Sequence, residues 1–272
     1  MGRKAMDSWE VSYPKGVIEC LDLFRDKYLQ YDTFDPILHD YIQTHLESGG
    51  KRVCSLGAGT GRHEVDLAKL GYDVVGLERD ALSVQMASEY INSHGVEVEM
   101  HECDFLIPDN IENCLREQEK FDVVILLFIP ISMYDYNRSL QFLSRYLKPG
   151  GIFVTNCFGY RNSIDRGKRV LDSDIEVCER KSKNDIIVRL NYYEYKNDIV
   201  DWDAIYLLEE DGQLVMKRDH DTLCVMPEEE YEDPLNVDRD IFEILPNYQI
   251  WEAEDCMTPP NLYEYLVGRR MK

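Results

Sequence analysis

Hydrophobic and polar positions along this chain follow one rhythm up to about residue 170 and another after it. From about residue 51 to 157, short apolar runs of strand type alternate with segments whose apolar residues have helical spacing. This alternation favours a parallel sheet covered by helices on both faces. The predicted strands are 52–56, 73–77, 96–101, 121–128 and 152–157, and the predicted helices are 61–70, 80–93 and 136–146.

After residue 170, four segments rich in branched and aromatic residues follow one another with short polar breaks between them. The breaks, such as Lys196-Asn197-Asp198 and Glu210-Asp211-Gly212, are typical of hairpin turns. Consecutive hairpins are antiparallel, so these strands cannot continue the parallel sheet. Residues 171–227 therefore predict an inserted antiparallel β cap, with strands at 175–180, 186–195, 199–208 and 213–217.

The two ends of the chain complete the pattern. Residues 1–50 have the apolar spacing of helices that stop at Gly49-Gly50, and these helices cover one edge of the main domain or simply pad its sheet. In the C-terminal part, the Glu228-Glu229-Glu230 run opens a predicted helix, and residues 248–254 and 262–268 predict two closing strands. The motif Lys148-Pro149-Gly150-Gly151 is expected to end the helix over 136–146.

Composition narrows the class of protein. With 272 residues and 44% hydrophobic content, the chain can bury one large core. The 52 acidic residues outnumber the 30 basic ones, giving a net charge of −22, and no basic patch of the kind that binds nucleic acid is visible. This acidity favours a cationic or amine-bearing partner, or it serves solubility alone.

Location and redox state follow from what the sequence contains. The longest apolar run, 123–131, is too short to span a membrane, and Met1-Gly2-Arg3-Lys4 is not followed by the apolar stretch of a secretory signal, so we expect a cytoplasmic protein without a membrane partner. The eight cysteines contain no C-x-x-C pair, which favours free thiols in a reducing compartment. No His/Cys cluster has metal-ligand spacing, so no metal site is expected.

The chemistry-bearing feature is a glycine-rich turn, Gly57-Ala58-Gly59-Thr60-Gly61, between a predicted strand and a predicted helix. Glycine lets the backbone turn tightly and approach a ligand, and the following helix presents free N–H groups. Glu78 stands at the tip of the second strand, where a carboxylate can accept hydrogen bonds from both hydroxyls of a ribose. The third glycine of the dinucleotide fingerprint would fall at Arg62, which disfavours NAD and an oxidoreductase.

These residues belong to a longer series of matching segments. In order they are 53–63 (VCSLGAGTGRH), 71–78 (GYDVVGLE), 101–105 (HECDF), 121–124 (FDVV) and 146–151 (YLKPGG). The series resembles class I S-adenosyl-L-methionine-dependent methyltransferases. The resemblance implies that S-adenosyl-L-methionine is the cofactor. It also implies a doubly wound, seven-stranded, mostly parallel α/β sheet of the Rossmann-like methyltransferase fold, here with the inserted cap.

The resemblance also implies roles for single residues. The expected cofactor-binding set covers the methionine end, the ribose, the adenine and the surroundings of the methyl donor: Gly57, Ala58, Gly59, Glu78, Arg79, Asp104, Phe105, Leu127 and Phe128. For Phe105 and Phe128 the alternative is a place in the core, and for Asp104 it is a loop cap. One departure stands out, because Ser55 occupies the position where the family usually has an acidic residue that neutralises the amino end of the cofactor.

The antiparallel insertion resembles small-molecule N-methyltransferases of the glycine and amino-sugar type. It implies three parts: helices over the cofactor cleft (1–50), a cofactor-binding domain (51–170 with 228–272) and a substrate cap (171–227). The predicted function is methyl transfer to a small-molecule acceptor, with an amine preferred. The alternatives are a peptide or protein amine as acceptor, or a cofactor-binding scaffold without turnover, for which Ser55 is the best argument.

An amine must be neutral to attack, and a nearby base can help, although the sequence leaves open whether one is used. The candidate catalytic residues are Tyr134, Tyr193 and Glu194. His220 is either such a base or a solvated loop residue. The aromatic residues of the cap either cage a cation against their rings or reflect the alternating faces of a half-buried hairpin: Tyr192, Tyr193, Tyr195 and Trp202. The sequence leaves the acceptor and the oligomeric state open.

Overall fold

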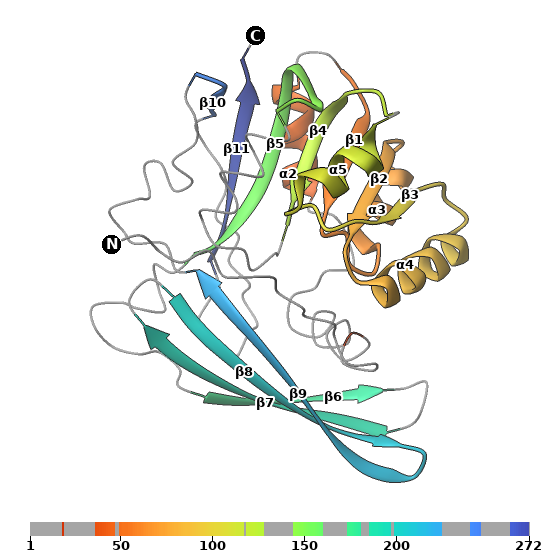
Figure 1. The fold of residues 1–272 in the computed structure, drawn as a ribbon, viewed down its shortest axis with the longest axis vertical. Helices are drawn as coiled ribbons and strands as arrows, with labels where there is room; N and C mark the ends of the chain where they lie inside the picture. Colours follow the sequence, from red (N-terminus) through yellow and green to blue (C-terminus); the bar gives the residue numbers. More distant parts are fainter. Residues whose placement is uncertain are drawn as a thin grey trace.

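The computed structural model describes residues 18, 36–46, 49–116, 118–127, 144–159, 173–180, 185–196, 199–224, 240–245 and 262–271. The strands in these ranges form two separate sheets, one of seven strands and one of four (Figure 1). The first sheet consists of β1 (Arg52–Leu56), β2 (Asp73–Glu78), β3 (Glu99–Glu102), β4 (Phe121–Leu126), β5 (Leu147–Gly159), β10 (Phe242–Ile244) and β11 (Leu262–Arg270).

The seven-stranded sheet has the order β10-β11-β5-β4-β1-β2-β3. Strands β1 to β5 run parallel to one another. Strand β11 runs antiparallel to β5, and β10 runs antiparallel to β11. The predicted doubly wound, mostly parallel sheet is therefore confirmed. Because parallel strands end at the same edge of a sheet, the carboxyl ends of β1, β2, β3 and β4 meet along one edge, at Leu56, Glu78, Glu102 and Leu126.

Helices cover both faces of this sheet, and the alternation of strand residues explains how. The described helices are α2 (Pro36–His45), α3 (Arg62–Lys69), α4 (Ala81–His94) and α5 (Pro108–Leu115). Ile111 and Leu115 of α5 pack on the face that carries Cys54 and Leu56 of β1. Ile42 of α2 and Leu67 of α3 pack on the opposite face, which carries Val53 of β1 and Val123 and Ile125 of β4.

Helix α2 pads the sheet, which was one of the two roles open for residues 1–50. Ile42 and Leu46 are buried against the sheet, and the carbonyl of His45 accepts a hydrogen bond of 3.0 Å from Arg269 of β11. Apart from Ile18 and α2, most of this N-terminal part lies outside the described residues, and its predicted role over the cofactor cleft stays a prediction.

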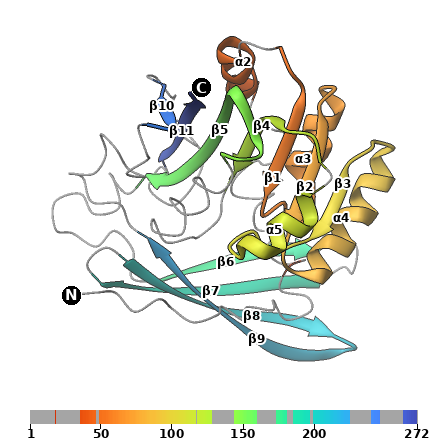
Figure 2. The same cartoon turned by 45° about the horizontal axis from the view of Figure 1, so that its top comes forward.

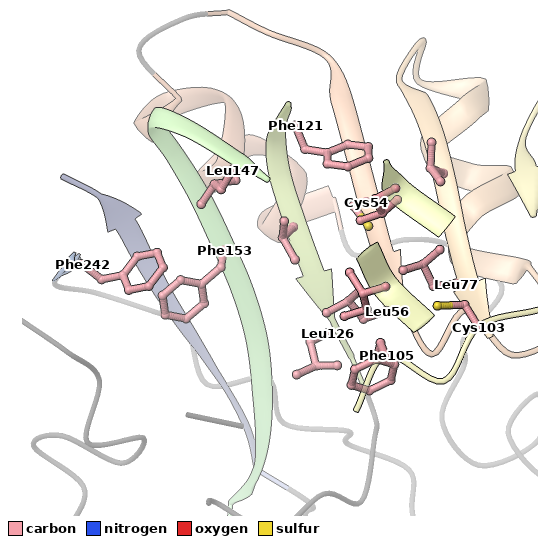
Figure 3. Close-up of a cluster of buried hydrophobic side chains, with 14 residues drawn as sticks. Cys54, Leu56, Leu77, Cys103, Phe105, Phe121, Leu126, Leu147, Phe153 and Phe242 are labelled. Atoms are coloured by element: carbon pink, nitrogen blue, oxygen red, sulfur yellow. The ribbon is translucent and has the colours of Figure 1, made fainter. Parts of the chain in front are cut away.

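On the face of the sheet that α5 covers, the apolar core extends from Leu56 and Leu77 of the parallel strands to Phe242 of the edge strand β10 (Figure 3). The rings of Phe153 on β5 and Phe242 on β10 meet edge to face, with 5.0 Å between their centroids. Phe153 also lies opposite Gly268 of β11, where a Cβ would come within 2.2 Å of the phenylalanine ring. The missing side chain of this glycine therefore makes room for the ring that ties three strands together.

The second sheet is antiparallel and lies beyond the carboxyl ends of the parallel strands in both views (Figures 1 and 2). It contains β6 (Ser173–Arg180), β7 (Asp185–Lys196), β8 (Ile199–Glu210) and β9 (Gln213–Cys224), paired in chain order. The predicted inserted β cap is confirmed, and its described strands fall within the predicted segment 171–227.

The two faces of the cap differ sharply in exposure. One face buries its side chains, among them Ile187, Asn191, Tyr206 and Asp219. The other face exposes large apolar side chains on β6, β7 and β9: Ile175, Val177, Ile186, Tyr192, Leu214 and Met216. A residue of the cap can therefore be assigned to the covered or to the open face from its place in the strand.

The motif Lys148-Pro149-Gly150-Gly151 was predicted to end a helix, but it lies inside strand β5. The pairing of β5 with β4 passes from Leu147–Phe121 to Ile152–Val123, so these four residues stand opposite Asp122 alone as a bulge. Proline has no N–H to give to the ladder, and Gly150 has a φ of 77°, which explains the bulge. Lys148 completes it with an ion pair of 3.0 Å to the buried Asp122.

Other expectations differ in detail. Strand β3 begins at Glu99 instead of 96, and helix α5 was not predicted. Strand β9 extends to Cys224, so the loop assignment of His220 was wrong: the residue is exposed in a strand, with its Nδ1 3.2 Å from Oδ1 of Asp203 on β8. The predicted helix over 136–146 falls almost wholly outside the described residues, as do the helix from residue 228 and the strand over 248–254.

Within the described ranges, no helix is long and apolar enough to cross a membrane.

We expect Phe153→Ala to lower the free energy of unfolding by about 3–5 kcal/mol, because the ring is fully buried among three strands and its loss leaves a cavity. Denaturant unfolding followed by circular dichroism measures the change. The matched control is Leu214→Ala, since Leu214 is 77% exposed on the open face of the cap, and this variant should stay within about 0.5 kcal/mol of the wild type. An equal loss in the two variants would contradict the role given to Phe153.

Candidate cofactor and acceptor site

The glycine turn connects the carboxyl end of β1 to the start of α3. Gly57, Gly59 and Gly61 have φ values of 66°, 56° and 80°, in the left-handed region that residues with a Cβ rarely adopt. The turn is fastened to the neighbouring strand, because the N–H groups of Gly57 and Ala58 both donate to the carbonyl of Leu77, at 2.7 and 3.0 Å. The sequence therefore builds a rigid backbone cradle at the edge where the parallel strands end.

Glu78, the last residue of β2, holds the far side of the same turn. Its Oε2 accepts a hydrogen bond of 3.0 Å from the N–H of Gly59, and its Oε1 accepts one of 2.9 Å from the N–H of Asp80. Burial raises the pKa of Glu78, and these two N–H groups counteract the rise by stabilising the charged form. Each carboxylate oxygen keeps a further lone pair, so the group can still accept from hydroxyls of a bound ribose.

A second glycine brings the turn and β2 together. A Cβ on Gly76 would lie 2.4 Å from Sδ of Met100 on β3 and 3.1 Å from Cβ of Ala58 in the turn. Only hydrogen at this position allows the turn to close over β2. The glycine within the matching segment 71–78 is therefore required by the packing of β2 against β3 and the glycine turn.

The loop after β3 joins the site through the backbone. The N–H of Cys103 donates to the carbonyl of Glu78 at 2.7 Å, and Oδ1 of Asp104 accepts from the N–H of Leu106 at 3.0 Å. The alternative role of Asp104 as a loop cap is therefore realised through one oxygen, which leaves Oδ2 for a ligand. Phe105 is 8% exposed within the core cluster, the place that its alternative as a core aromatic gave it.

The remaining predicted residues have the following positions. Arg79 is half-buried directly after Glu78, and Leu127 is buried in the core just past the end of β4. Phe128 lies outside the described residues. The structure thus brings the glycine turn, Glu78, Arg79, Asp104 and Leu127 to one edge of the sheet, and their assignment to a ligand stays a prediction.

Glu64 on α3 was not among the predicted site residues. It is 1% exposed, and its Oε1 accepts a hydrogen bond of 2.5 Å from the hydroxyl of Ser55 on β1. Burial raises the pKa of Glu64 to about 7, although the Ser55 hydrogen bond lowers it. A signal was present in the sequence, because Glu64 is spaced three and four residues from Leu67 and Ala68, on the apolar side of the helix.

The candidate catalytic residues do not share one location. Tyr193 pairs with Trp202 across β7 and β8 and is partly buried, whereas Glu194 is exposed, and successive strand residues point to opposite faces. Tyr193 therefore lies on the covered face of the cap and Glu194 on the open face. Tyr134 lies outside the described residues, so its predicted role stays a prediction.

Trp202 already has partners from its own sheet. Its Nε1 donates to Oδ1 of Asn191 at 2.9 Å, and the guanidinium of Arg189 lies 5.6 Å from the centre of its ring. Tyr192 lies on the open face, whereas Tyr193 and Trp202 are partners on the covered face. The alternating faces of a half-buried hairpin account for Tyr192, and a role of the other rings around a cation stays a prediction.

Comparison with known proteins gives a family. Residues 47–215, more than half of the 272-residue chain, match the family model described as a methyltransferase domain. A ubiquinone biosynthesis O-methyltransferase from Xanthomonas euvesicatoria pv. vesicatoria (strain 85-10) is 28% identical over 118 residues, which are 43% of this chain and 47% of that protein. The chain thus matches over about half the length of the curated relatives it resembles.

Solved structures extend the likeness of the fold to nearly the whole chain. The sugar N-methyltransferase KedS8 from Streptoalloteichus sp ATCC 53650 covers 100% of both chains with a TM-score of 0.67 and 18% identity. CalS10 with SAM bound, an amino pentose methyltransferase from Micromonospora echinaspora, covers 97% of this chain and 100% of its own with a TM-score of 0.62 and 17% identity. The chain belongs to the methyltransferase domain family, and its class is the S-adenosylmethionine-dependent methyltransferases that the series of matching segments resembles.

Proposed function

We propose that this protein transfers a methyl group from S-adenosylmethionine to a small-molecule acceptor, and that the acceptor is an amine. The observation that carries the proposal is the cradle at the carboxyl edge, where the carboxylate of Glu78 and the carbonyl of Leu77 hold the glycine turn through three hydrogen bonds. The N–H groups of Gly57 and Ala58 meet Leu77, and that of Gly59 meets Glu78. A turn held in this way is preorganised for a nucleoside-bearing cofactor.

The residues at this edge fit the cofactor part by part. The backbone of Gly57, Ala58 and Gly59 would line its methionine end, and Glu78 would accept from its ribose hydroxyls. The carboxylate of Asp104, which holds the N–H of Leu106 through Oδ1, would accept from the adenine amino group through Oδ2, beside Phe105 and Arg79. Leu127, together with Phe128, would border the methyl group, where an apolar wall keeps water away.

The bound cofactor supplies an activated methyl carbon, so the protein needs to position the acceptor against this carbon, exclude water from the site and let one proton leave. A nitrogen acceptor would form its bond to the methyl carbon with its lone pair, the carbon–sulfur electrons would stay with sulfur, and the methylated nitrogen would release its extra proton to solvent. The nitrogen must be neutral beforehand. The hydroxyl of Tyr193, on the covered face of the cap, can accept a hydrogen bond from this nitrogen and aim its lone pair.

Two considerations support an amine as the acceptor. The net charge of −22 raises the local concentration of cationic molecules near the protein. The solved structures KedS8 and CalS10, which share this fold over the cap as well, are described as acting on a sugar nitrogen and on an amino pentose. The curated relatives, in contrast, are O-methyltransferases, so an oxygen acceptor is the second candidate.

The proposal assigns parts of the chain to steps. The cap (171–227) binds the acceptor, the segments 51–170 and 228–272 bind the cofactor, and the helices of 1–50 close the cleft. We further propose a cytoplasmic location without nucleic-acid or membrane partners, which suits the free thiols of Cys54, Cys103 and Cys114. A peptide amine as acceptor and a scaffold without turnover remain the alternatives for the assays below.

For the cofactor, we expect Glu78→Ala to weaken the binding of S-adenosylhomocysteine by about 10- to 100-fold, because hydrogen bonds to a charged group are lost. Isothermal titration calorimetry measures the affinity, and a thermal melt checks that the variant is folded. The control is Glu97→Ala, since Glu97 is exposed before β3 and away from the turn. Failure of the wild type to bind S-adenosylhomocysteine would contradict the proposal, and tight binding of NADH would favour a dehydrogenase.

For the acceptor, we expect the purified protein to label a member of a panel of small amine metabolites from methyl-labelled S-adenosylmethionine. Tyr193→Phe should then lower kcat by about 100-fold, as for an acceptor that has lost the hydrogen bond that orients it. Tyr192→Phe is the matched control, because this neighbour lies on the open face. Labelling of phenols alone would favour an oxygen acceptor, labelling of a peptide pool a protein substrate, and no labelling a scaffold.

The same assay separates the catalytic candidates. Glu194→Gln and Tyr134→Phe test the other two predicted residues, and an unchanged kcat in Tyr193→Phe would remove Tyr193 from the mechanism.

A further inference from the structure

Glu64 is a buried carboxylate that no basic side chain of the described residues is seen to pair with. It is 1% exposed, its Oε1 accepts from Ser55, and its Oε2 is buried without a hydrogen-bond partner among the described residues. The charged groups whose field acts on it, Glu78 on β2 and Asp66 on its own helix, are both negative. A buried carboxylate in such surroundings costs stability unless a cation or a proton reaches it.

The place of Glu64 points to one kind of cation. The residue belongs to the first turn of α3, directly after the glycine turn, and Ser55 is the last residue but one of β1, directly before it. The carboxylate therefore lies between the two ends of the cofactor cradle. Both oxygens of Glu78, the other acid beside the glycine turn, already accept from backbone N–H groups. Of these two acids, Glu64 is therefore the one with an oxygen that has no hydrogen-bond partner among the described residues.

We propose that Glu64, oriented by Ser55, binds the ammonium group of the amino-acid part of S-adenosylmethionine. This inference rests on the proposed function and deepens it. It also gives a reason for Ser55: the negative charge has moved from the strand to the facing helix, and the serine hydroxyl aims it. The acid expected on β1 is therefore displaced, so Ser55 no longer argues for a scaffold without turnover.

The arrangement links binding to pH. The ionised form of Glu64 binds the ammonium group, whereas the free protein favours its protonated form, with a pKa of about 7. Affinity for S-adenosylhomocysteine should therefore be full at about pH 8 and should fall as the pH drops through 7, approaching about tenfold per pH unit below it. Above pH 7 the same burial makes the free protein less stable, since the unfolded chain ionises Glu64 more easily.

Calorimetry on the full chain tests this with two ligands, S-adenosylhomocysteine and 5′-methylthioadenosine, which lacks the amino-acid part. We expect Glu64→Gln to weaken the first by about 10- to 100-fold, as for a lost charged hydrogen bond, and to leave the second unchanged. The double variant Ser55→Asp/Glu64→Gln returns the charge to β1 and should recover affinity for S-adenosylhomocysteine. The pH dependence seen in the wild type should disappear in Glu64→Gln.

Each other outcome has a definite meaning. Unchanged affinity of Glu64→Gln for S-adenosylhomocysteine overturns the inference, and so does an equal loss for both ligands, because Glu64 would then shape the turn only. A wild type that binds neither ligand refutes the proposed function instead. A thermal melt at pH 8 guards against misfolding, since Glu64→Gln removes a buried charge and should melt at the wild-type temperature or above it.

Discussion

The hydrogen bonds between the glycine turn and the end of β2 are the constraint on which the site depends. Two N–H groups of the turn share the carbonyl of Leu77, a third meets the carboxylate of Glu78, and the absent side chain of Gly76 lets the two segments approach. A left-handed glycine turn would otherwise cost conformational entropy without return. Here it fixes the start of α3, and with it Glu64, relative to the strands that end beside it.

The hydrophobic periodicity of the sequence predicted those helices and strands whose buried side is marked by their own apolar residues. Strands β1 and β2 are short apolar runs that were predicted almost to the residue, and the turn residues of the cap placed its hairpins correctly, although β9 is seven residues longer than predicted. Helix α5 escaped because it spans only eight residues, with its buried Ile111 and Leu115 set among polar side chains. The Pro-Gly-Gly motif led to a wrong prediction because a proline without an N–H and a glycine with positive φ interrupt the hydrogen bonds of a helix and of a strand alike.

The site was predictable in its backbone and less so in its side chains. The spacing of the glycines and Glu78 required only a strand–turn–helix unit, which a sequence encodes directly. The burial of Glu64 depends on a tertiary partner, Ser55, on another element, and the separation of Tyr193 from Glu194 depends on which face of the cap is covered. Helical spacing can mark Glu64 for the apolar side of α3, but its partner and the covered face of the cap are decided by packing between elements.

The pairing of β11 with β5 has a consequence for how this protein can change. Strand β5 ends at Gly159 and β11 begins at Leu262, and these two residues are partners across the ladder. The insertion between them, which holds the cap and the short edge strand β10, thus has its ends held together by the sheet, and doubling the length of such a loop costs only about 0.6 kcal/mol in closure entropy. The cap lies within this loop, so it can be lengthened, shortened or exchanged while the cofactor cradle stays intact, and acceptor preference can evolve separately from methyl-donor binding.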